Sequence, residues 1–488
     1  MKMVEKGERN SLVVQSTKWS AIGELLSKLA SPLINIILAR LLVPEVFGLV
    51  ATFQLVTTFA EIFTDAGFQK YLVQHEFTSQ EEKTKTTNVA FWTNFGISIF
   101  FWFIILFARF PIARLVGSPG HEIEICVLSL QIPLHAFSSI QISLFRRDFR
   151  FKELAPIKII TSIVPIVITV PLAYFLRSAW AIIIGNLAKE AINVILLFIK
   201  SPWKPKLYFK LSTLREMLGD CFWLLADSIS IWLTAYSGTF IVSQVLDEYY
   251  VGLYKTGITT ITSYISLIST IVAPVLFSAF SRKQSQRNEL QKEFFSTQKA
   301  LLYILLPIGF ASFVFRDLIT QILLGSQWLA IADLMGIVGL STAISIGTAQ
   351  HNSVYLRAIG KPIRAFIIQT VFVVIMIVTL GIFVNRPFEE LCFVRGILGF
   401  VYIVISSVIV WITEKISFMK VLINNIPAII ATLITTVFAT LFLRLCGGSI
   451  VMQIVCGFIS ICVYILMLII IPSSRADLFA MVKKRKII

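Results

Sequence analysis

The stretch SAIGELLSKLASPLIN, residues 20–35, is apolar enough for a membrane helix, yet it carries polar residues at regular steps. Ser20, Glu24, Lys28, Ser31 and Asn35 recur every three or four residues, which places them on one face of a helix. A face with an acid and a base must contact protein or water, because charged groups are costly in lipid. The stretch therefore predicts a membrane helix that lines a polar interior.

The composition of the whole chain is that of an all-α polytopic membrane protein. Its 488 residues are 57% hydrophobic and 14% charged, and they include 40 Phe. Runs such as ISIFFWFIILF (97–107) alternate with short charged clusters, as in transmembrane helices. These runs predict about fourteen spans, at 17–42, 46–68, 87–110, 122–145, 154–176, 178–200, 214–243, 249–279, 297–316, 329–354, 363–384, 391–413, 420–443 and 449–472.

The N-terminus does not suggest processing, and the cysteines do not suggest a metal centre. The basic N-terminus is not followed by a short apolar segment with a small-residue cleavage site, so we expect no cleaved signal peptide. The six cysteines form no CxxC pair and the four histidines are scattered. We therefore expect no disulfide framework, no metal site and no bound cofactor.

The net charge of +16 is explained by orientation and not by nucleic-acid binding. If the N-terminus is cytoplasmic, thirty Lys and Arg residues fall on the inner side and seven on the outer side. The seven are Arg40, Arg109, Arg114, Arg177, Arg316, Arg386 and Arg444. Such a bias predicts that both termini are cytoplasmic, with contact to anionic lipid as a side effect.

Two halves of the chain resemble each other. LLVPEVFGLV (41–50) is echoed by QVLDEYYVGLY (244–254), and LFRRDFRFKELAPIKII (144–160) by VYLRAIGKPIRAFII (354–368). The offsets predict two six-helix lobes in a parallel, pseudo-twofold repeat around a central cavity, as in transporters. We expect an N-terminal lobe (1–200), an interfacial linker (201–213), a C-terminal lobe (214–413), and two further helices with a basic tail (414–488).

Polar stripes recur on the first two helices of each half. Glu61 and Asp65 share a face with Gln54, and Asp227 and Lys255 lie on corresponding stripes of the second half. Further polar positions are Gln131, His135 and Ser138, then Asn186, Lys189, Glu190 and Asn193, and Arg395. The alternative is plain helix packing, since Ser and Thr are common at membrane helix contacts and Glu24 could simply neutralise Lys28.

No motif for bond-making chemistry is present. The sequence lacks GxxxxGK[ST], GxSxG and HExxH, and its external loops are short. Transport is therefore favoured over catalysis, because a membrane glycosyltransferase or polymerase would ordinarily need sizeable external loops.

Several segments resemble the bacterial polysaccharide transporter family. They are ARLLVPEVFGL (39–49), DAGF (65–68) and RRDFRFKELA (146–155). The chain is similar to the Wzx-type flippases of the multidrug/oligosaccharidyl-lipid/polysaccharide exporter superfamily, most of all to the colanic-acid and teichuronic-acid exporter branch. The resemblance covers essentially the whole chain.

The resemblance implies a two-lobed bundle of fourteen spans in the bacterial inner membrane that is not an enzyme. It implies export of a polyprenyl-pyrophosphate-linked oligosaccharide, with polysaccharide polymerase machinery as a further partner. Cavity-lining roles carry over to Glu24, Lys28, Glu61, Asp65, Asp227 and Lys255, and further to Arg40, Lys189, Glu190 and Arg395.

Two driving forces are alternatives for transport by such a protein. Lys28 and Lys255 are candidate counter-charges for the pyrophosphate, which the membrane potential would then move outward. The carboxylates could instead bind H⁺ or Na⁺, as resemblance to related drug exporters suggests. A cation-coupled drug or small-molecule antiporter of the same superfamily is the alternative function, and a membrane enzyme of polysaccharide assembly is the alternative from a different class.

Overall fold

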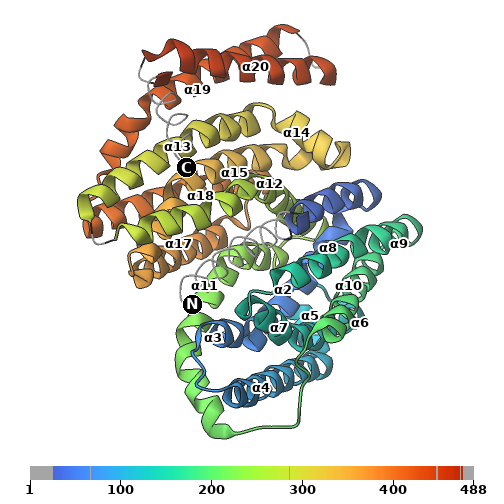
Figure 1. The fold of residues 1–488 in the computed structure, drawn as a ribbon. Helices are drawn as coiled ribbons and strands as arrows, with labels where there is room; N and C mark the ends of the chain where they lie inside the picture. Colours follow the sequence, from blue (N-terminus) through green and yellow to red (C-terminus); the bar gives the residue numbers. More distant parts are fainter. Residues whose placement is uncertain are drawn as a thin grey trace. The chain divides into compact units, whose positions relative to one another are not determined.

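The computed structural model describes residues 23, 26–65, 67–284, 286–446, 449–472 and 474–475, with the backbone alone at residues 65, 218–224 and 446. The chain divides into two compact units, Met1–Gly252 and Leu253–Ile488. Both are built from α-helices over their described residues (Figure 1). The all-helical fold class is therefore confirmed, while the lobe boundaries expected from the sequence stay a prediction.

The first unit contains the helices α2 to α11. They are α2 (Pro44–Asp65), α3 (Phe68–Gln74), α4 (Gln80–Phe107), α5 (Arg109–Leu115), α6 (Glu122–Ser129), α7 (Gln131–Arg147), α8 (Phe151–Val167), α9 (Thr169–Leu176), α10 (Ala179–Lys200) and α11 (Leu211–Ser243). Residues 26–41 are helical as well.

Helix α12 (Glu248–Arg282) begins in the first unit and continues into the second. The second unit then contains α13 (Arg287–Val314), α14 (Arg316–Leu323), the 3₁₀ segment η1 (Ser326–Ile331), α15 (Ala332–Ser345), the π-helical segment η2 (Ile346–Gln350), α16 (His351–Ala358), α17 (Pro362–Phe383), α18 (Phe388–Glu414), α19 (Phe418–Cys446) and α20 (Ile450–Ile470).

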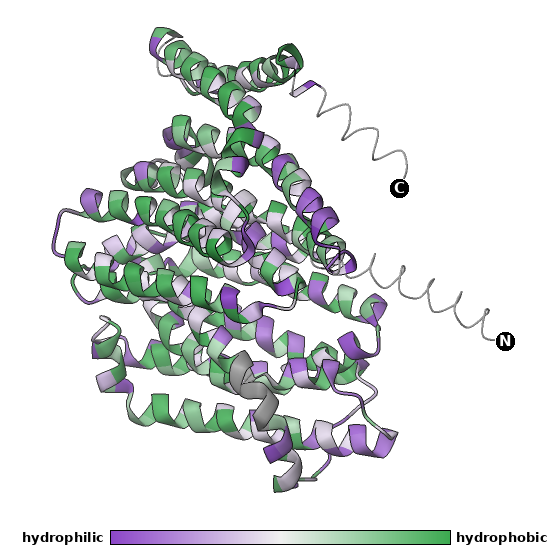
Figure 2. Cartoon of the chain, turned by 90° about the vertical axis from the view of Figure 1, so that its left-hand side faces the viewer, coloured by the Kyte–Doolittle hydropathy of each residue, from purple (hydrophilic) through white to green (hydrophobic). Residues whose placement is uncertain are grey.

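Thirteen helical stretches of the described chain are long and apolar enough to cross a membrane. Hydrophobic residues cover the long helices, and strongly hydrophilic residues gather at many helix ends (Figure 2). The thirteen stretches correspond to the second to fourteenth spans expected from the sequence. Part of the first span, 17–42, lies outside the described residues, and its described part is helical. The prediction of about fourteen spans is consistent with this count, and the protein is a multi-pass membrane protein.

Two spans contain breaks that the apolar pattern does not reveal. Helices α8 and α9 meet at Ile168, three residues before Pro171. Proline has no backbone N–H for the carbonyl four residues earlier, and its ring crowds that carbonyl. In the span Ser326–Ala358, residues 346–350 widen into a π-helix. Such widening is common at functional sites of helices.

Many hydroxyl groups of the spans are satisfied within their own helix. Thr259 donates to the carbonyl of Lys255, and Thr262 to that of Ile258, over 2.8 and 2.6 Å. A hydroxyl in an apolar medium gains from such a bond to the preceding turn. The packing interpretation therefore accounts for these two threonines of the polar stripe on α12.

Arg147, the last residue of α7, fixes the end of α3. Its Nη1 donates to the carbonyls of Leu72 and His75, each over 2.6 Å. Its guanidinium also lies 4.4 Å from the ring centroid of Phe77. The carbonyls at a helix end lack partners in the helix, so this one cation holds the segment after α3 against α7.

Two glycines allow the N-terminal turns of α2 and α12 to approach each other closely. A Cβ at Gly48 would lie 1.8 Å from the carbonyl oxygen of Glu248, and a Cβ at Gly252 would lie 1.9 Å from that of Pro44. The contact is reciprocal: each glycine faces the first residue of the other helix. Reciprocity of this kind is expected where a twofold axis passes between two segments. It joins the same two motifs that resemble each other in sequence.

Replacing Gly48 by Ala is expected to destabilise the protein. The new methyl group would overlap a backbone carbonyl, and overpacking costs roughly 1–3 kcal/mol. Thermal unfolding of the purified protein should show a lower midpoint for Gly48→Ala.

The matched control is Gly96→Ala in α4, where an added Cβ meets nothing within 4 Å. There the higher helix propensity of Ala should leave the midpoint unchanged or raise it. Equal midpoints for both variants would contradict the close packing of α2 on α12.

Candidate functional site

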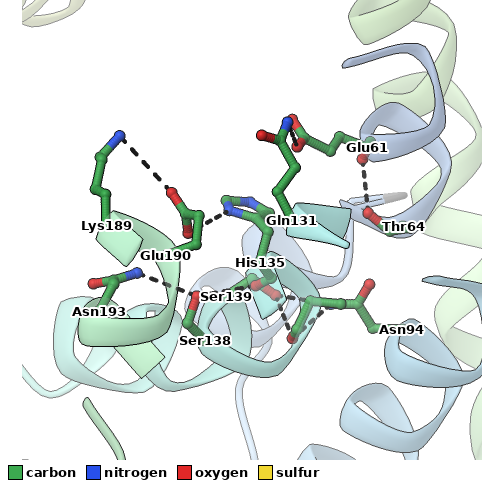
Figure 3. A network of polar contacts seen from close by, with 11 residues as sticks. Glu61, Thr64, Asn94, Gln131, His135, Ser138, Ser139, Lys189, Glu190 and Asn193 are labelled. Atoms are coloured by element: carbon green, nitrogen blue, oxygen red, sulfur yellow. Dashed lines mark hydrogen bonds and ion pairs between the residues drawn. The ribbon is translucent and has the colours of Figure 1, made fainter. Parts of the chain in front are cut away.

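A cluster of charged and polar side chains lies inside the first unit, on α2, α4, α7 and α10 (Figure 3). Helix α7 packs against each of the other three. Its polar residues recur at steps of three and four, so they project together toward these neighbours. This arrangement brings Glu61, Lys189 and Glu190 of the expected site residues into one place.

Glu61 on α2 is bound by a side chain of α7. The Nε2 of Gln131 donates to its Oε1 over 3.0 Å. The carboxylate also interacts electrostatically with His135, Glu190 and Lys189. A carboxylate inside a membrane span needs such partners, because an unpaired charge there is costly.

His135 on α7 and Lys189 on α10 flank the second carboxylate, that of Glu190. The Nδ1 of His135 lies 3.9 Å from Oε2 of Glu190, and Nζ of Lys189 lies 3.8 Å from Oε1. These are ion-pair distances, longer than hydrogen bonds. The side chain of Glu190 is 17% exposed, against 35% for His135 and 43% for Lys189.

Amide and hydroxyl groups hold the helices of the cluster in register. Asn193 Nδ2 donates to Ser138 Oγ over 3.3 Å, which links α10 to α7. Asn94 Nδ2 donates to Ser139 Oγ over 2.7 Å, which links α4 to α7. Their bonds fix where His135 stands relative to Glu190 and Glu61.

Aromatic side chains of α11 complete the cluster on the side of α2. Trp232 Nε1 donates to Thr58 Oγ1 over 2.9 Å, and its ring stacks on Tyr236 with centroids 5.5 Å apart. Tyr236 interacts electrostatically with Glu61. Trp and Tyr suit this position because each joins an apolar ring to a polar tip.

Within the second unit, Lys255 and Arg395 are neighbours of like charge. Lys255 on α12 is half-buried, and its ammonium is repelled by the guanidinium of Arg395 on α18. Two cations held together form a strong attractor for an anion. The structure thus brings these two expected site residues together.

Around the π-helical segment η2, the second unit has its own buried polar contacts. Ser269 on α12 donates to Gln350 over 3.1 Å, and Thr297 on α13 lies 3.0 Å from Nε2 of His351. His351 is 1% exposed. These bonds join α12, α13 and α16 at the point where the span is widened.

The other expected site residues lie elsewhere or outside the description. Asp227 is half-buried on α11, while Lys28 and Arg40 are exposed on the helical stretch 26–41. Glu24 and the side chain of Asp65 lie outside the described residues. The cavity role of all ten residues therefore stays a prediction.

The cluster can hold a proton or a small cation, because it combines two carboxylates with an imidazole. A histidine changes charge near physiological pH, and its partner carboxylate stabilises the charged form. Among the described residues, no group of three or more His, Cys, Asp or Glu side chains is arranged to hold a metal ion. The two carboxylates and the imidazole suit ion pairing and proton exchange.

Sequence reasoning placed His135, Gln131 and Asn193 on polar stripes but not among the site residues, and it missed Trp232 and Tyr236. The three polar residues could have been found from their spacing, which matches that of the chosen charges. The aromatic pair gave no signal, because aromatic residues are frequent throughout the spans.

Comparison with known proteins identifies the family. The sequence profile of the family described as "Polysaccharide biosynthesis protein" matches residues 37–333. The chain is 25% identical over 325 residues to the succinoglycan biosynthesis transport protein ExoT of Rhizobium meliloti (strain 1021), covering 67% of this chain. It is 23% identical over 363 residues to the lipopolysaccharide biosynthesis protein WzxC of Escherichia coli (strain K12), covering 72% of this chain and 69% of WzxC. The match spans 65% of the length of ExoT.

Solved structures show the same fold. The lipid II flippase MurJ in an inward closed conformation matches with a TM-score of 0.75 at 16% identity, over 92% of this chain and 98% of MurJ. An inward-facing multidrug resistance MATE family transporter of the MOP superfamily matches with a TM-score of 0.57 at 12% identity, over 85% of this chain and 95% of that transporter. The resemblance to Wzx-type transporters is confirmed: the chain belongs to the polysaccharide biosynthesis protein family.

Proposed function

We propose that this protein moves a polyprenyl-pyrophosphate-linked oligosaccharide from the inner to the outer leaflet of the bacterial inner membrane, for surface polysaccharide biosynthesis. The charged cluster on α2, α7 and α10 carries the proposal. Charged side chains within membrane spans generally mark the pathways of substrates and ions. The names of ExoT, WzxC and MurJ, which include two polysaccharide biosynthesis proteins and a lipid II flippase, support this cargo.

The lipid tail of the cargo stays in the bilayer while the pyrophosphate and sugars cross between two lobes by alternating access. In this scheme the lobes are residues 1–200 and 214–413, and both termini are cytoplasmic. The reciprocal contact of Gly48 and Gly252 supports a twofold relation between the segments 41–50 and 244–254.

Lys28 and Lys255 serve as counter-charges for the pyrophosphate in this mechanism. Arg395 adds a second cation beside Lys255, which favours binding of a dianion. Outward movement of two negative charges down a potential of about 100 mV releases roughly 5 kcal/mol. Export can then proceed without an obligatory ion.

A second candidate is a cation-coupled antiporter for drugs or small molecules. The grouping of Glu61, His135 and Glu190 favours it, because these side chains exchange protons. Coupling to H⁺ or Na⁺ is also compatible with oligosaccharide export. Polysaccharide polymerase machinery is a further partner of the exporter in our scheme.

The function can be tested in vesicles that contain the purified protein and a short polyprenyl-pyrophosphate oligosaccharide. Exposure of the sugar on the opposite leaflet should require the protein and should increase with an imposed potential. Protein-free vesicles are the control. If several such cargoes show no exposure while a drug substrate is transported, the antiporter is the correct function.

Replacing both Lys28 and Lys255 by Gln is expected to lower the transport rate at least about tenfold, because the pyrophosphate loses two charge-assisted contacts. The thermal midpoint should stay unchanged. The matched control replaces the exposed Lys152 and Lys420 by Gln, which removes the same charge from the chain. Wild-type transport in the Lys28/Lys255 variant would exclude these lysines as counter-charges.

Separate replacement of Glu61 and Glu190 by Gln tests ion coupling. Each change keeps the size of the side chain and removes the charge that faces His135. Transport driven by a pH or Na⁺ gradient should fall at least about tenfold, as expected when a buried ionic partner is lost. Glu81→Gln, at an exposed ion pair with Lys85, is the control. Gradient-driven transport at the wild-type rate in both variants would show that this cluster does not couple transport to an ion gradient.

A further inference from the structure

A separate polar pocket lies where α4 begins and where α7 and α10 end, and the segment that follows α10 closes it. Its volume is about 360 Å³. That is at the lower end of the range for small-molecule sites. The start of α4, the end of α7 and the residues after Lys200 all contribute to its lining. None of the residues of the charged cluster belongs to it.

The wall made by residues 201–206 is held in place by hydrogen bonds. The backbone N–H of Lys206 donates to Oδ1 of Asn88 over 2.8 Å, and Nε1 of Trp92 donates to the carbonyl of Lys206 over 2.9 Å. Ser201 Oγ donates to the carbonyl of Trp203 over 3.0 Å. The segment has no helix of its own, so these bonds to α4 define the shape of the pocket.

Four cations and one carboxylate line the pocket: Lys83, Arg150, Lys204, Lys206 and Asp148. Asp148 binds Lys83 over 2.7 Å. Arg150 pairs with Glu153 through two bonds of 2.6 Å. The lining therefore carries three more positive than negative charges.

Lys204 and Lys206 carry the part of this positive charge that no described acidic side chain pairs with. Neither makes an ion pair with a described residue. Lys204 instead places its Nζ 4.0 Å from the ring centroid of Phe198. The acids at the start of α4 are engaged elsewhere, Glu81 with Lys85 over 2.6 Å and Glu82 with the N–H of Thr78 over 2.7 Å.

We propose that this pocket binds a phosphate-bearing anion. Its excess of positive charge suits a phosphate or pyrophosphate group, and lysine binds phosphate as a point charge. Because three spans end at the pocket, it lies level with the lipid headgroups or just beyond them. The phosphate can thus come from an anionic lipid headgroup or from a soluble phosphorylated molecule. Binding of such an anion does not require that the protein transports a cargo.

The test uses the full chain in nanodiscs and two probes. Inorganic pyrophosphate is titrated into phosphatidylcholine nanodiscs by calorimetry, and phosphatidylglycerol bound to protein from mixed nanodiscs is counted by native mass spectrometry. Replacing Lys204 and Lys206 by Gln should weaken the binding of at least one probe about tenfold. If the variant binds pyrophosphate more weakly, the pocket takes a soluble phosphorylated molecule. If it binds phosphatidylglycerol more weakly, the pocket takes a lipid headgroup.

The matched control replaces Lys152, in the first turn of α8, and Lys210, directly before α11, by Gln; both lysines are exposed and neither lines the pocket. This control should bind both probes as the wild type does. Equal weakening in the two double variants would overturn the proposal, because it would show diffuse surface attraction. Absence of binding of either probe by the wild type would overturn it as well.

A further variant covers the case in which the double lysine variant does not fold. Asp148→Asn removes the one carboxylate of the lining and should tighten binding about fivefold. Unchanged or weaker binding by a folded Asp148→Asn protein would contradict the pocket. These readouts are equilibrium binding, so their failure is distinct from a failure of the proposed transport.

Discussion

The absence of water from the bilayer interior is the constraint on which this structure depends. Every backbone N–H and carbonyl must be satisfied within the protein, and only helices achieve this in a single segment. The same constraint sends the hydroxyls of Thr259 and Thr262 back to their own helix. Groups that one helix cannot satisfy must find partners on another, as Glu61 does with Gln131. The charged cluster is thus one place where helices of the first unit depend on one another's side chains.

The helices could be predicted from sequence because each apolar run is long enough to span a membrane and ends at charged residues. The stop at Ile168 could have been read from Pro171, although α8 itself continues through Pro156 and Pro165. A proline therefore marks a possible break without deciding it, since neighbouring helices can satisfy the freed carbonyl. The π-helix at residues 346–350 gave no signal, because it depends on tertiary packing. In the sequence, only the similarity of their two motifs indicates the close approach at Gly48 and Gly252.

The candidate site was less predictable than the fold, for a physical reason. Periodicity tells which residues share a face of one helix, but it does not tell which faces meet. Glu61, Lys189 and Glu190 were chosen because a charge inside a span needs an explanation. Gln131 and His135 carry no permanent charge, so from the sequence they look like packing residues, and only their distances to the carboxylates place them in the cluster. Lys255 and Arg395 lie 140 positions apart in the sequence, and only the fold makes them neighbours.

The order of charges along α4, α7 and α10 separates two kinds of chemistry. Cations gather at one end of these helices, where Lys83 and Arg150 stand. Glu190 lies ten residues before the end of α10, which is about 15 Å along the helix. A pyrophosphate is attracted by the first group and repelled by the carboxylates of Glu61 and Glu190. Those acids are therefore poor ligands for an anionic cargo and good ligands for a proton or a cation. Lys255 and Arg395 are two cations whose charges repel each other, and they suit the anionic cargo that we propose better than the two acids do. The proposed binding of an anionic cargo and the proposed binding of a coupling ion therefore involve different side chains, and mutation can test each without the other.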